Sequence, residues 1–372
     1  MDSTHEAVLA DLARLALRAP SRATFFDEAA ARLQRVVPHD GACWHTLDPG
    51  SDLVTDHRLQ NIPDRFPLIA HNEYQVDDVN KFAELARAPR KAASMHEATG
   101  GRLERSARYR DLLAAGGIGS ELRGAFVADG ATWGAVIMIR MADADEFSRD
   151  EIELLDRASP LFARAVRRGL VTEASRAATP PTNAPGVLEL DASGRLERAS
   201  STAEPLLEEL SGTTAEQGWR SPAIQAMTSA TRKAIAVRAP RLPSSAVKTP
   251  AGTWLVLHGA VLGGRGVAVF IQRAHPTLVA PLLLKAYGLT AREQEVAQLL
   301  LRGATTAQAA KRLAISPHTV NEHVKAIYDK TGARTRGELS ASVFFGEHLP
   351  RIQSRVAVGD DASFVDAPRP RT

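Results

Sequence analysis

The sequence predicts a multidomain protein in which two α+β domains, the second one small, precede an all-α domain of four helices. The length is the first reason, because 372 residues exceed a single domain of about 150 residues. A stretch rich in Ser, Thr, Pro and Ala, without an apolar period, indicates a linker at 172–186. Apolar residues recur only at helical spacing in 282–345, which indicates a separate helical domain.

The composition is typical of a folded protein in a reducing compartment. Apolar residues make up 44% of the chain and charged residues 24%, which is the balance of globular proteins and excludes wholesale disorder. Cys43 is the only cysteine, so neither an internal disulfide nor a cysteine-based zinc cluster can form. The N-terminal residues lack the order of a signal peptide, and no apolar stretch reaches membrane-spanning length. We therefore expect a cytoplasmic protein without membrane association.

The changes of pattern along the chain set the expected domain boundaries. Strands and helices mix before the linker, and a smaller strand-rich part follows it. Beyond the last helix lies a tail that we expect to be mobile. The expected parts are a first domain at 1–171, the linker at 172–186, a small domain at 187–273, a connector at 274–287, a helical domain at 288–349 and the tail at 350–372.

The first domain is expected to begin with two helices and two strands. Apolar residues three and four positions apart predict helices near 8–16 and 25–36. Two short segments, 42–47 and 53–59, have extended patterns. Cys43 lies in the first of these strands, where we expect a small buried side chain and not a redox centre.

A hairpin and a long helix are expected to close the first domain. The segments 121–128 and 132–140 flank Asp129-Gly130, a dipeptide strongly favoured in two-residue hairpin turns. Ser148 and Glu151 have the spacing of a capping box, which predicts the start of a helix that continues to about Arg168.

This order of elements resembles a GAF domain. The strand at 132–140 fits the pattern xxWGxVxxxR, and a Phe-Ser cap and the long terminal helix follow it. The resemblance implies an antiparallel sheet with helices on one face, a small ligand over the other face in many members, and a sensor, not an enzyme. Irregular segments within 60–118 would then close over a pocket, although filling of the domain's own core is the simpler role for the same aromatic residues. The candidate pocket residues are Trp44, Phe66, Tyr74 and Tyr109.

The small domain is expected to contain strands around one helix. Two strands joined by a turn precede a helix near 203–210, and three further extended segments follow. The run from Gly263 to Gly266 lacks the Lys-Ser/Thr pair of a phosphate-binding loop, so we expect a hairpin turn there. This order resembles a PAS-like module, and a purely structural α+β spacer is the alternative.

Four consecutive helix starts mark the last domain. Each start places a hydroxyl just before the helix, where it accepts a hydrogen bond from an otherwise unpaired backbone N–H. Three starts carry Glu or Gln at capping-box spacing, and the other carries proline at the first helical position. Short connections then require a compact bundle. The capping hydroxyls belong to Thr290, Thr305, Ser316 and Thr335, and Gly303 and Gly332 end the first and third helices.

The second and third of these helices form a helix-turn-helix. The apolar side of the third helix carries Val320, Val324 and Ile327. The opposite face would enter the major groove of DNA, where Asn pairs with adenine, Lys donates to guanine and Glu accepts from cytosine. At about 100° per residue, that face carries His318, Asn321, Glu322, Lys325 and Asp329.

The basic excess of the chain is confined to this helical part. Residues 282–345 hold nine Lys or Arg and five Asp or Glu, a net charge of +4. The whole chain holds 46 basic and 43 acidic residues, so the remainder holds 37 and 38, a net charge of −1. A basic excess concentrated in one domain indicates a polyanionic partner.

The segment 288–339 resembles the LuxR-type helix-turn-helix domain. Its residues follow the pattern LTxRExEVxxLxxxGxxxxxIAxxLxISxxTVxxHxxxIxxKLxxxxRxEL, and depart from it at Ala309 and at Asn321-Glu322. The resemblance implies double-stranded DNA as the partner and assigns roles to three groups of residues. Asn321, Glu322 and Lys325 would read bases; Ser316, Thr319, Lys330, Lys311 and Arg336 would contact the DNA backbone; Leu339, Val343 and Phe344 would form a dimer helix or pack within the domain.

Together these features predict a sequence-specific transcriptional regulator controlled by a small molecule or another signal that the N-terminal domains sense. The expected partners are double-stranded DNA, a second copy of the chain, an unidentified small molecule and RNA polymerase. Alternatively, the N-terminal domains serve only dimerisation or the binding of a protein partner. A phosphorylated response regulator would need a βαβ pattern that 1–171 lacks, and an acyl-homoserine-lactone receptor would lack the middle domain.

An enzyme, or a metal or redox sensor, is the least expected function. His39, His45, His57 and His71 lie near one another in the sequence but without HxH or HxxxH spacing. We therefore expect core or solvated histidines, no metal, no catalytic residue and no cofactor.

Overall fold

The computed structural model describes residues 3–172, 184–191, 193–261, 266–344, 357–358 and 364–365. They form two compact units. The described residues of Met1–Thr172, Pro185–Pro250 and Leu255–Gln272 form the first, and those of Glu173–Ala184, Ala251–Trp254 and Arg273–Thr372 form the second. The parts expected as separate domains at 1–171 and 187–273 therefore fall within one compact unit, although each has a sheet of its own.

The first sheet is antiparallel, with the strand order β2-β1-β5-β4-β3. The Asp129-Gly130 turn joins β4 to β5 with φ values of 51° and 73°, as the hairpin dipeptide predicts. The four predicted strands are present, and the short β3 was not predicted. The bounds are β1 Gly41–Asp48, β2 Leu53–Gln60, β3 Ala92–Ser94, β4 Ile118–Ala128 and β5 Ala131–Met141.

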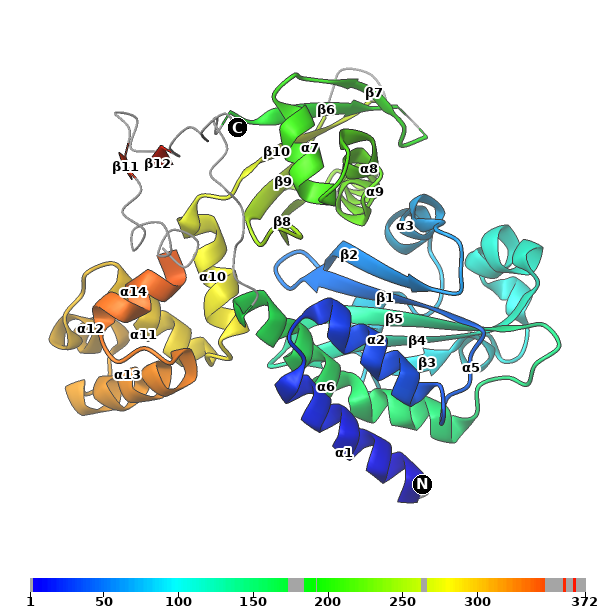
Figure 1. The fold of residues 1–372 in the computed structure, drawn as a ribbon, viewed down its shortest axis with the longest axis horizontal. Helices are drawn as coiled ribbons and strands as arrows, with labels where there is room; N and C mark the ends of the chain where they lie inside the picture. Colours follow the sequence, from blue (N-terminus) through cyan, green and yellow to red (C-terminus); the bar gives the residue numbers. More distant parts are fainter. Residues whose placement is uncertain are drawn as a thin grey trace, which may run out of the picture. The chain divides into compact units, whose positions relative to one another are not determined.

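Three helices, α1 (Ser3–Arg18), α2 (Arg22–Leu33) and α6 (Arg149–Thr172), cover one face of this sheet (Figure 1). An aromatic stack fills the space beneath them, with Trp44 and Phe162 ring centroids 5.3 Å apart and Phe126 and Phe162 centroids 4.6 Å apart. The capping box that predicts the start of α6 is present, because Ser148 N–H donates to Glu151 and Glu151 N–H donates to Ser148 Oγ.

Short helices from the segment 60–118 cover the other face. We expected irregular stretches here, and that expectation is wrong: several helical turns occur. Neither α3 nor α4 has a side-chain N-cap, so the usual start signal is absent from the sequence and packing on the sheet fixes these helices instead. The bounds are α3 Phe66–Gln75, α4 Phe82–Arg87, α5 Met95–Thr99, η1 Leu103–Arg105, the π-helical η2 Tyr109–Leu113 and η3 Ala114–Gly116.

The second sheet has the strand order β7-β6-β10-β9-β8. Its strands and α7 follow the predicted order, and α8 and α9 add helices that we did not predict. The start of α9 is buried on nearly every side, so its sequence lacks the polar face of an ordinary surface helix. The bounds are β6 Gly186–Leu190, β7 Leu196–Ala199, α7 Ala203–Ser211, α8 Ala215–Trp219, α9 Pro222–Ala236, β8 Ser244–Lys248, β9 Trp254–Val261 and β10 Val267–Arg273.

The second unit is helical, with its own apolar core around Val296, Val320 and Ile327. The four predicted helices are present, and α10 precedes them in the segment expected as a connector. Thr290 and Thr305 both form complete capping boxes, and Gly332 ends α13 with φ 73°. The bounds are α10 Pro276–Ala286, α11 Ala291–Leu301, α12 Thr306–Leu313, α13 Pro317–Thr331 and α14 Arg336–Phe344.

Some expectations concern residues outside the described ranges. They include the linker over 173–183, the turn at 262–265 and most of the tail, in which only the paired strands β11 (Ala357–Val358) and β12 (Phe364–Val365) are described. No helix in the described part of the chain is both long and apolar enough to cross a membrane.

Candidate functional site

The turn between α12 and α13 sets the geometry of the helix-turn-helix. Ala314 adopts a left-handed conformation with φ 53°, and Ile315 N–H donates to the Ala310 carbonyl at 3.1 Å, which closes the end of α12. Ser316 then caps α13, because its Oγ accepts a hydrogen bond from Thr319 N–H at 3.0 Å. These local bonds fix the direction in which α13 leaves the turn.

One face of α13 is buried in the domain and the other is open to solvent. Val320 and Ile327 are fully buried, with 0% exposure. The opposite face is exposed, as the helical spacing predicts. It carries His318, Asn321, Glu322, Lys325 and Asp329, all of them exposed.

The five residues expected at the DNA backbone fall into two groups. Ser316, Thr319 and Lys311 are exposed at or beside the turn. In contrast, Lys330 Nζ lies 2.6 and 2.9 Å from the carboxylate oxygens of Glu293, and the Arg336 guanidinium donates to the carbonyls of Leu300 and Ala304. Lys330 and Arg336 thus already bind groups of their own domain.

The ion pair between Lys330 and Glu293 has consequences for both ends of the domain. Glu293 also accepts the Thr290 N–H at 2.7 Å, so one carboxylate caps the start of α11 and binds the end of α13. Burial opposes the ionisation of Glu293, but Lys330 and the Thr290 N–H outweigh it and hold the pKa of this carboxyl below its ordinary value. The sequence shows the capping box but not this second role.

The helix proposed for dimerisation contributes to the core of its own domain. Leu339 is 0% exposed and Val343 is 3% exposed, and both lie in the apolar core of the second unit. The side chain of Phe344 lies outside the described residues. Packing within the domain therefore accounts for the two apolar residues that can be placed.

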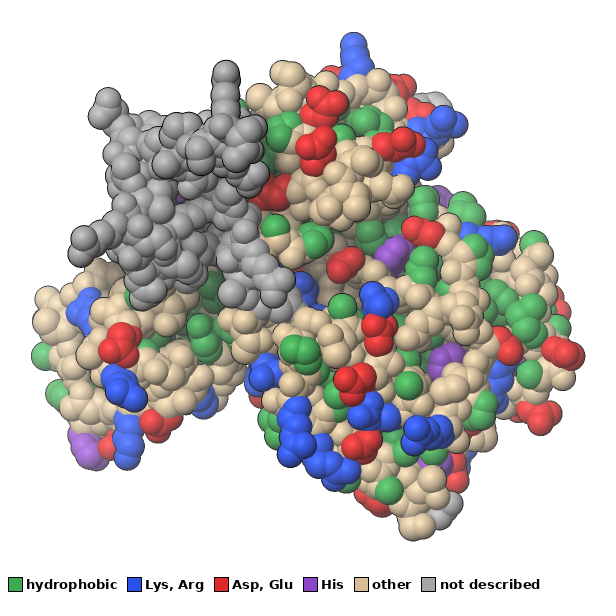
Figure 2. Space-filling model, in the orientation of Figure 1, with side chains coloured by type: hydrophobic (Ala, Val, Ile, Leu, Met, Phe, Trp, Pro, Cys, Tyr) green, Lys and Arg blue, Asp and Glu red, His purple; other side chains and the backbone are tan. Residues whose placement is uncertain are grey.

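Exposed basic side chains of the second unit favour contact with a polyanion near the helix-turn-helix. Lys311, Arg312 and Lys325 are exposed, and within the described ranges they form no ion pair. Positive and negative side chains are otherwise intermixed on the face seen in Figure 2. Arg302 and Arg334, which flank the helix-turn-helix, are also exposed, so the exposed cations of the described residues lie both on the helix-turn-helix and beside it.

The four candidate pocket residues of the first domain do not converge. Trp44 faces α2 and α6 in the aromatic stack, whereas Phe66 lies across the sheet, 5.8 Å from the ring of His45. Tyr74 is partly buried, and its hydroxyl accepts the Val54 N–H at 2.9 Å. Tyr109 packs in a separate small cluster with Met95 and Leu112. Alternation along β1 explains the separation, because neighbouring strand residues point to opposite faces.

The histidines considered as metal ligands occupy different environments. His45 is buried, His71 is exposed, and His39 and His57 are partly buried. Burial lowers the pKa of His45 well below its ordinary value, so its imidazole is neutral. Within the part of the chain that the structure describes, no three His, Cys, Asp or Glu side chains are arranged to hold a metal ion.

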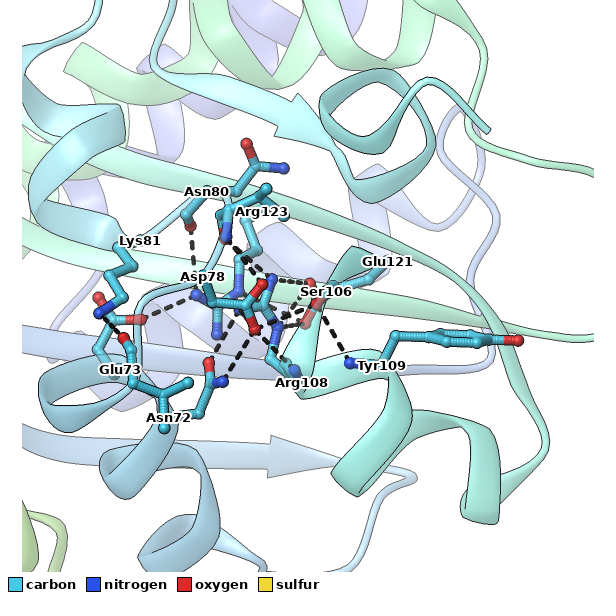
Figure 3. A network of polar contacts seen from close by, with 12 residues as sticks. Asn72, Glu73, Asp78, Asn80, Lys81, Ser106, Arg108, Tyr109, Glu121 and Arg123 are labelled. Atoms are coloured by element: carbon cyan, nitrogen blue, oxygen red, sulfur yellow. Dashed lines mark hydrogen bonds and ion pairs between the residues drawn. The ribbon is translucent and has the colours of Figure 1, made fainter. Parts of the chain in front are cut away.

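A buried charge network that was not predicted lies on the same side of the sheet as His45 (Figure 3). Arg108 Nη2 lies 2.7 Å from Glu121, and Arg123 Nη1 lies 2.8 Å from Glu73. Asp78 accepts the Arg108 N–H at 2.6 Å. The one available signal is the alternation of Glu121 and Arg123 with apolar residues in a strand, which places both charges on one face.

The charges of this network support one another. Burial disfavours ionised Glu121, but Arg108 and Arg123 outweigh it and hold the pKa of Glu121 below its ordinary value. Burial likewise opposes the charge of Arg123, and Glu121 and Glu73 raise its pKa in spite of this. The network therefore pairs three carboxylates (Glu73, Asp78 and Glu121) with two guanidinium groups (Arg108 and Arg123).

Comparison with known proteins identifies the C-terminal domain. The family described as bacterial regulatory proteins of the luxR family matches residues 288–342. The second unit therefore contains a LuxR-family helix-turn-helix domain, as the motif predicts. No curated protein matches the chain.

Several solved structures show limited similarity. VqmA of Vibrio cholerae, in a complex with ligand and DNA, is 21% identical, with 45% of this chain and 86% of that chain covered and a TM-score of 0.23. The bacteriophytochrome RpBphP3 of R. palustris is 9% identical, covers 73% of this chain and 63% of its own, and has a TM-score of 0.35. The E. coli DhaR(N)–DhaL complex is 10% identical, with 74% and 91% covered and a TM-score of 0.23. Values this low do not establish a shared architecture.

Proposed function

We propose that this chain is a sequence-specific DNA-binding transcriptional regulator whose activity is controlled by a small molecule bound to the first unit. The observation that carries the proposal is the exposed face of α13 within a domain that matches the luxR family. Asn321, Glu322 and Lys325 are exposed together on that face, and all three side chains have hydrogen-bonding groups suited to base edges.

The proposed complex places α13 in the major groove. Ser316 and Thr319, at the start of α13, and Lys311, on α12, contact the DNA backbone and fix the register, while the base contacts provide specificity. Glu322 favours a base contact over a phosphate contact, because a carboxylate is repelled by phosphate. For Lys330 and Arg336 we propose a positioning role, since both already bind groups of the domain.

We propose that two copies bind one near-palindromic site in the cytoplasm and act on RNA polymerase from there. Each copy would place its α13 in one half-site, and the two-fold symmetry of the protein would match that of the DNA. Because Leu339 and Val343 are buried in their own domain, the contact between copies must use other surfaces.

The proposed signal is a small molecule that binds the DNA-competent and incompetent arrangements of the protein with unequal affinity. Only such a difference allows a ligand to shift the equilibrium between them. The buried polar groups of the first unit support this input, because they lie apart from the DNA-reading face on a unit with its own core.

Selection of genomic DNA fragments tests the proposal. Purified full-length protein and residues 276–349 alone would each be equilibrated with the fragments at about 150 mM salt, where nonspecific binding is weakened. We expect a near-palindromic motif from both proteins, or from the fragment alone if the first unit inhibits binding until the signal arrives. Absence of a motif from both would refute sequence-specific binding. A motif without any metabolite-dependent change would favour N-terminal domains that serve only dimerisation or partner binding.

A further inference from the structure

The face of the first sheet opposite the aromatic stack places two polar side chains close to small neighbours. His45 on β1 pairs with Ala135 on β5, which in turn pairs with Ala125 on β4. One row further, Cys43, Ile137 and Arg123 pair in the same way. All of these residues share one face, because they alternate with residues of the opposite face. The two alanine side chains are short, so they project little from the sheet between His45 and β4.

Both polar side chains have buried atoms without partners. His45 and Arg123 are each 0% exposed. Within the described ranges, His45 Nε2 and Arg123 Nη2 have no hydrogen-bond partner. A buried polar atom left unpaired destabilises a fold, so native proteins rarely retain one unless another group binds it. These two atoms on one face are therefore available to a further hydrogen-bonding group.

His45 and Arg123 both lie beside the ring of Phe82. The Arg123 guanidinium carbon lies 4.7 Å from the ring centroid of Phe82, and the His45 ring lies 5.3 Å from the same ring. Phe66 lies 5.8 Å from the His45 ring. Both phenylalanines are buried. A ligand bound here would meet flat apolar surfaces, which favours a flat molecule.

The unpaired groups are hydrogen-bond donors. Arg123 has only N–H groups, and the arginine is held ionised by Glu73 and Glu121. Cys43 Sγ lies 3.9 Å from His45 Nδ1, and burial raises the thiol pKa, so the neutral S–H can donate to Nδ1. When the thiol donates in this way, the imidazole proton is on Nε2. A ligand must therefore supply an acceptor.

The surrounding charge decides between a neutral and an anionic acceptor. The network that includes Arg123 contains three carboxylates and two guanidinium groups in a buried region, as described above (Figure 3). A carboxylate ligand would add a fourth carboxylate to this region, which a low-dielectric site disfavours. A neutral carbonyl adds none.

We propose that His45 and Arg123, with Phe66 and Phe82, bind a small, flat, uncharged molecule through its carbonyl oxygen. The inference rests on the proposed function only in taking this molecule as the signal. Entry requires movement of the covering helices, and α4 suits this because it is six residues long and has no side-chain cap.

The site is connected to the second sheet through α3 and α9. Phe66 and Glu73 both lie on α3, and Glu73 accepts the Phe82 N–H at 2.7 Å as well as the Arg123 guanidinium. The same helix packs against α9. A ligand that displaces Phe66 or Phe82 therefore acts on α3, which binds the first sheet through Glu73 and packs against α9, and α9 in turn contacts β8 of the second sheet.

Three molecules of nearly the same shape test the proposed chemistry. Benzamide offers a neutral carbonyl, benzoate an anionic acceptor and toluene no acceptor. Binding of each to the full-length protein would be measured by calorimetry and by the change in Tm, with a benzamide Kd expected on the order of 1 mM. We expect benzamide to bind at least about tenfold more tightly than either analogue, a difference of about 1.4 kcal/mol.

Variants locate the binding site. His45→Phe removes Nε2 and retains an aromatic ring, and Arg123→Lys retains the charge but removes Nη2. Each should weaken benzamide binding at least about tenfold. His71→Phe makes the same substitution at an exposed position of α3 and should leave binding unchanged. Arg123→Lys keeps the test decisive if His45→Phe fails to fold.

Other outcomes would overturn the inference. Tighter binding of benzoate would make the site anionic, and equal binding of toluene would exclude recognition through the carbonyl. No binding of any probe, or binding unaffected by both site variants, would exclude this site. DNA binding by the same samples separates the two proposals: intact DNA binding without benzamide binding refutes only the ligand site, and the converse refutes only the regulator.

Discussion

Replacing Lys330 with methionine tests whether Lys330 positions elements of its own domain or contacts DNA. Methionine retains most of the apolar length of the side chain and removes the ammonium. In the wild-type protein that ammonium lies 2.6 Å from Glu293, whose side chain is 8% exposed, whereas that of Lys330 is 35% exposed. The substitution therefore leaves a nearly buried carboxylate without its cation. Lys325→Met makes the same change at an exposed lysine of the same helix that has no such partner.

The environment of the pair sets the expected magnitude. Exposed ion pairs contribute about 0.2–1 kcal/mol, and breaking a fully buried one costs about 3–5 kcal/mol. This pair lies between the two cases, and Glu293 keeps the hydrogen bond from Thr290 N–H at 2.7 Å. We expect Lys330→Met to lower the free energy of unfolding of the second unit by about 1–2 kcal/mol, and Lys325→Met to change it by less than about 0.5 kcal/mol.

The effect should also depend on pH. The pKa of Glu293 is below its ordinary value in the folded domain, so the pair stabilises the domain fully above the unfolded pKa of about 4.3. That contribution is lost as the pH falls through the lower, folded pKa, because the carboxylate is then protonated. The difference in unfolding free energy between wild type and Lys330→Met should shrink accordingly at acidic pH.

Urea unfolding of residues 276–349, followed by far-ultraviolet circular dichroism, measures these differences. DNA binding as a function of salt concentration measures the other role. A variant with unchanged stability and a salt slope reduced by about one unit would refute the positioning role and restore Lys330 as a phosphate contact.

Three further predictions concern the interface and the buried network. Lys325→Ala should weaken binding to the preferred site by about 1–3 kcal/mol and relax the preference at one base pair, as measured by selection of randomised DNA; equal loss at all sequences would contradict base readout. Ser316→Ala should lower the stability of the second unit by about 0.5–2 kcal/mol, as measured by urea unfolding, because Thr319 N–H loses its acceptor. Glu121→Gln should destabilise the first unit by about 3 kcal/mol, as measured by tryptophan fluorescence in urea; an unchanged midpoint would mean that the buried arginines do not need this charge.

Local signals in the sequence predicted those elements whose causes are local. Asp129-Gly130 accepts the positive φ values of a tight turn, and Ser316 and Thr290 supply their hydroxyls within three residues of the bonds that they form. The helix-turn-helix was predictable for this reason, together with its exposed face. Family resemblance supplied the function of that face.

The missed features depend on contacts between distant parts of the chain. Glu73 and Arg123 are 50 positions apart, and no spacing rule connects them. The four candidate pocket residues lie apart, because aromatic composition does not tell which face of a strand a side chain occupies. The helix α9 was missed because its burial by neighbouring elements removes the amphipathic pattern that identifies helices.

The double role of Glu293 limits how the DNA-binding domain can be regulated. One carboxylate joins the first turn of α11 to the last turn of α13, so α13 cannot tilt without disturbing both. We therefore expect the domain to bind DNA as a rigid body. A signal would then change how the DNA-binding domains of two copies are linked. This changes the effective concentration of the second domain at its half-site once the first domain is bound. Control of this kind changes the occupancy of the DNA site steeply, while the base preference of each DNA-binding domain stays constant.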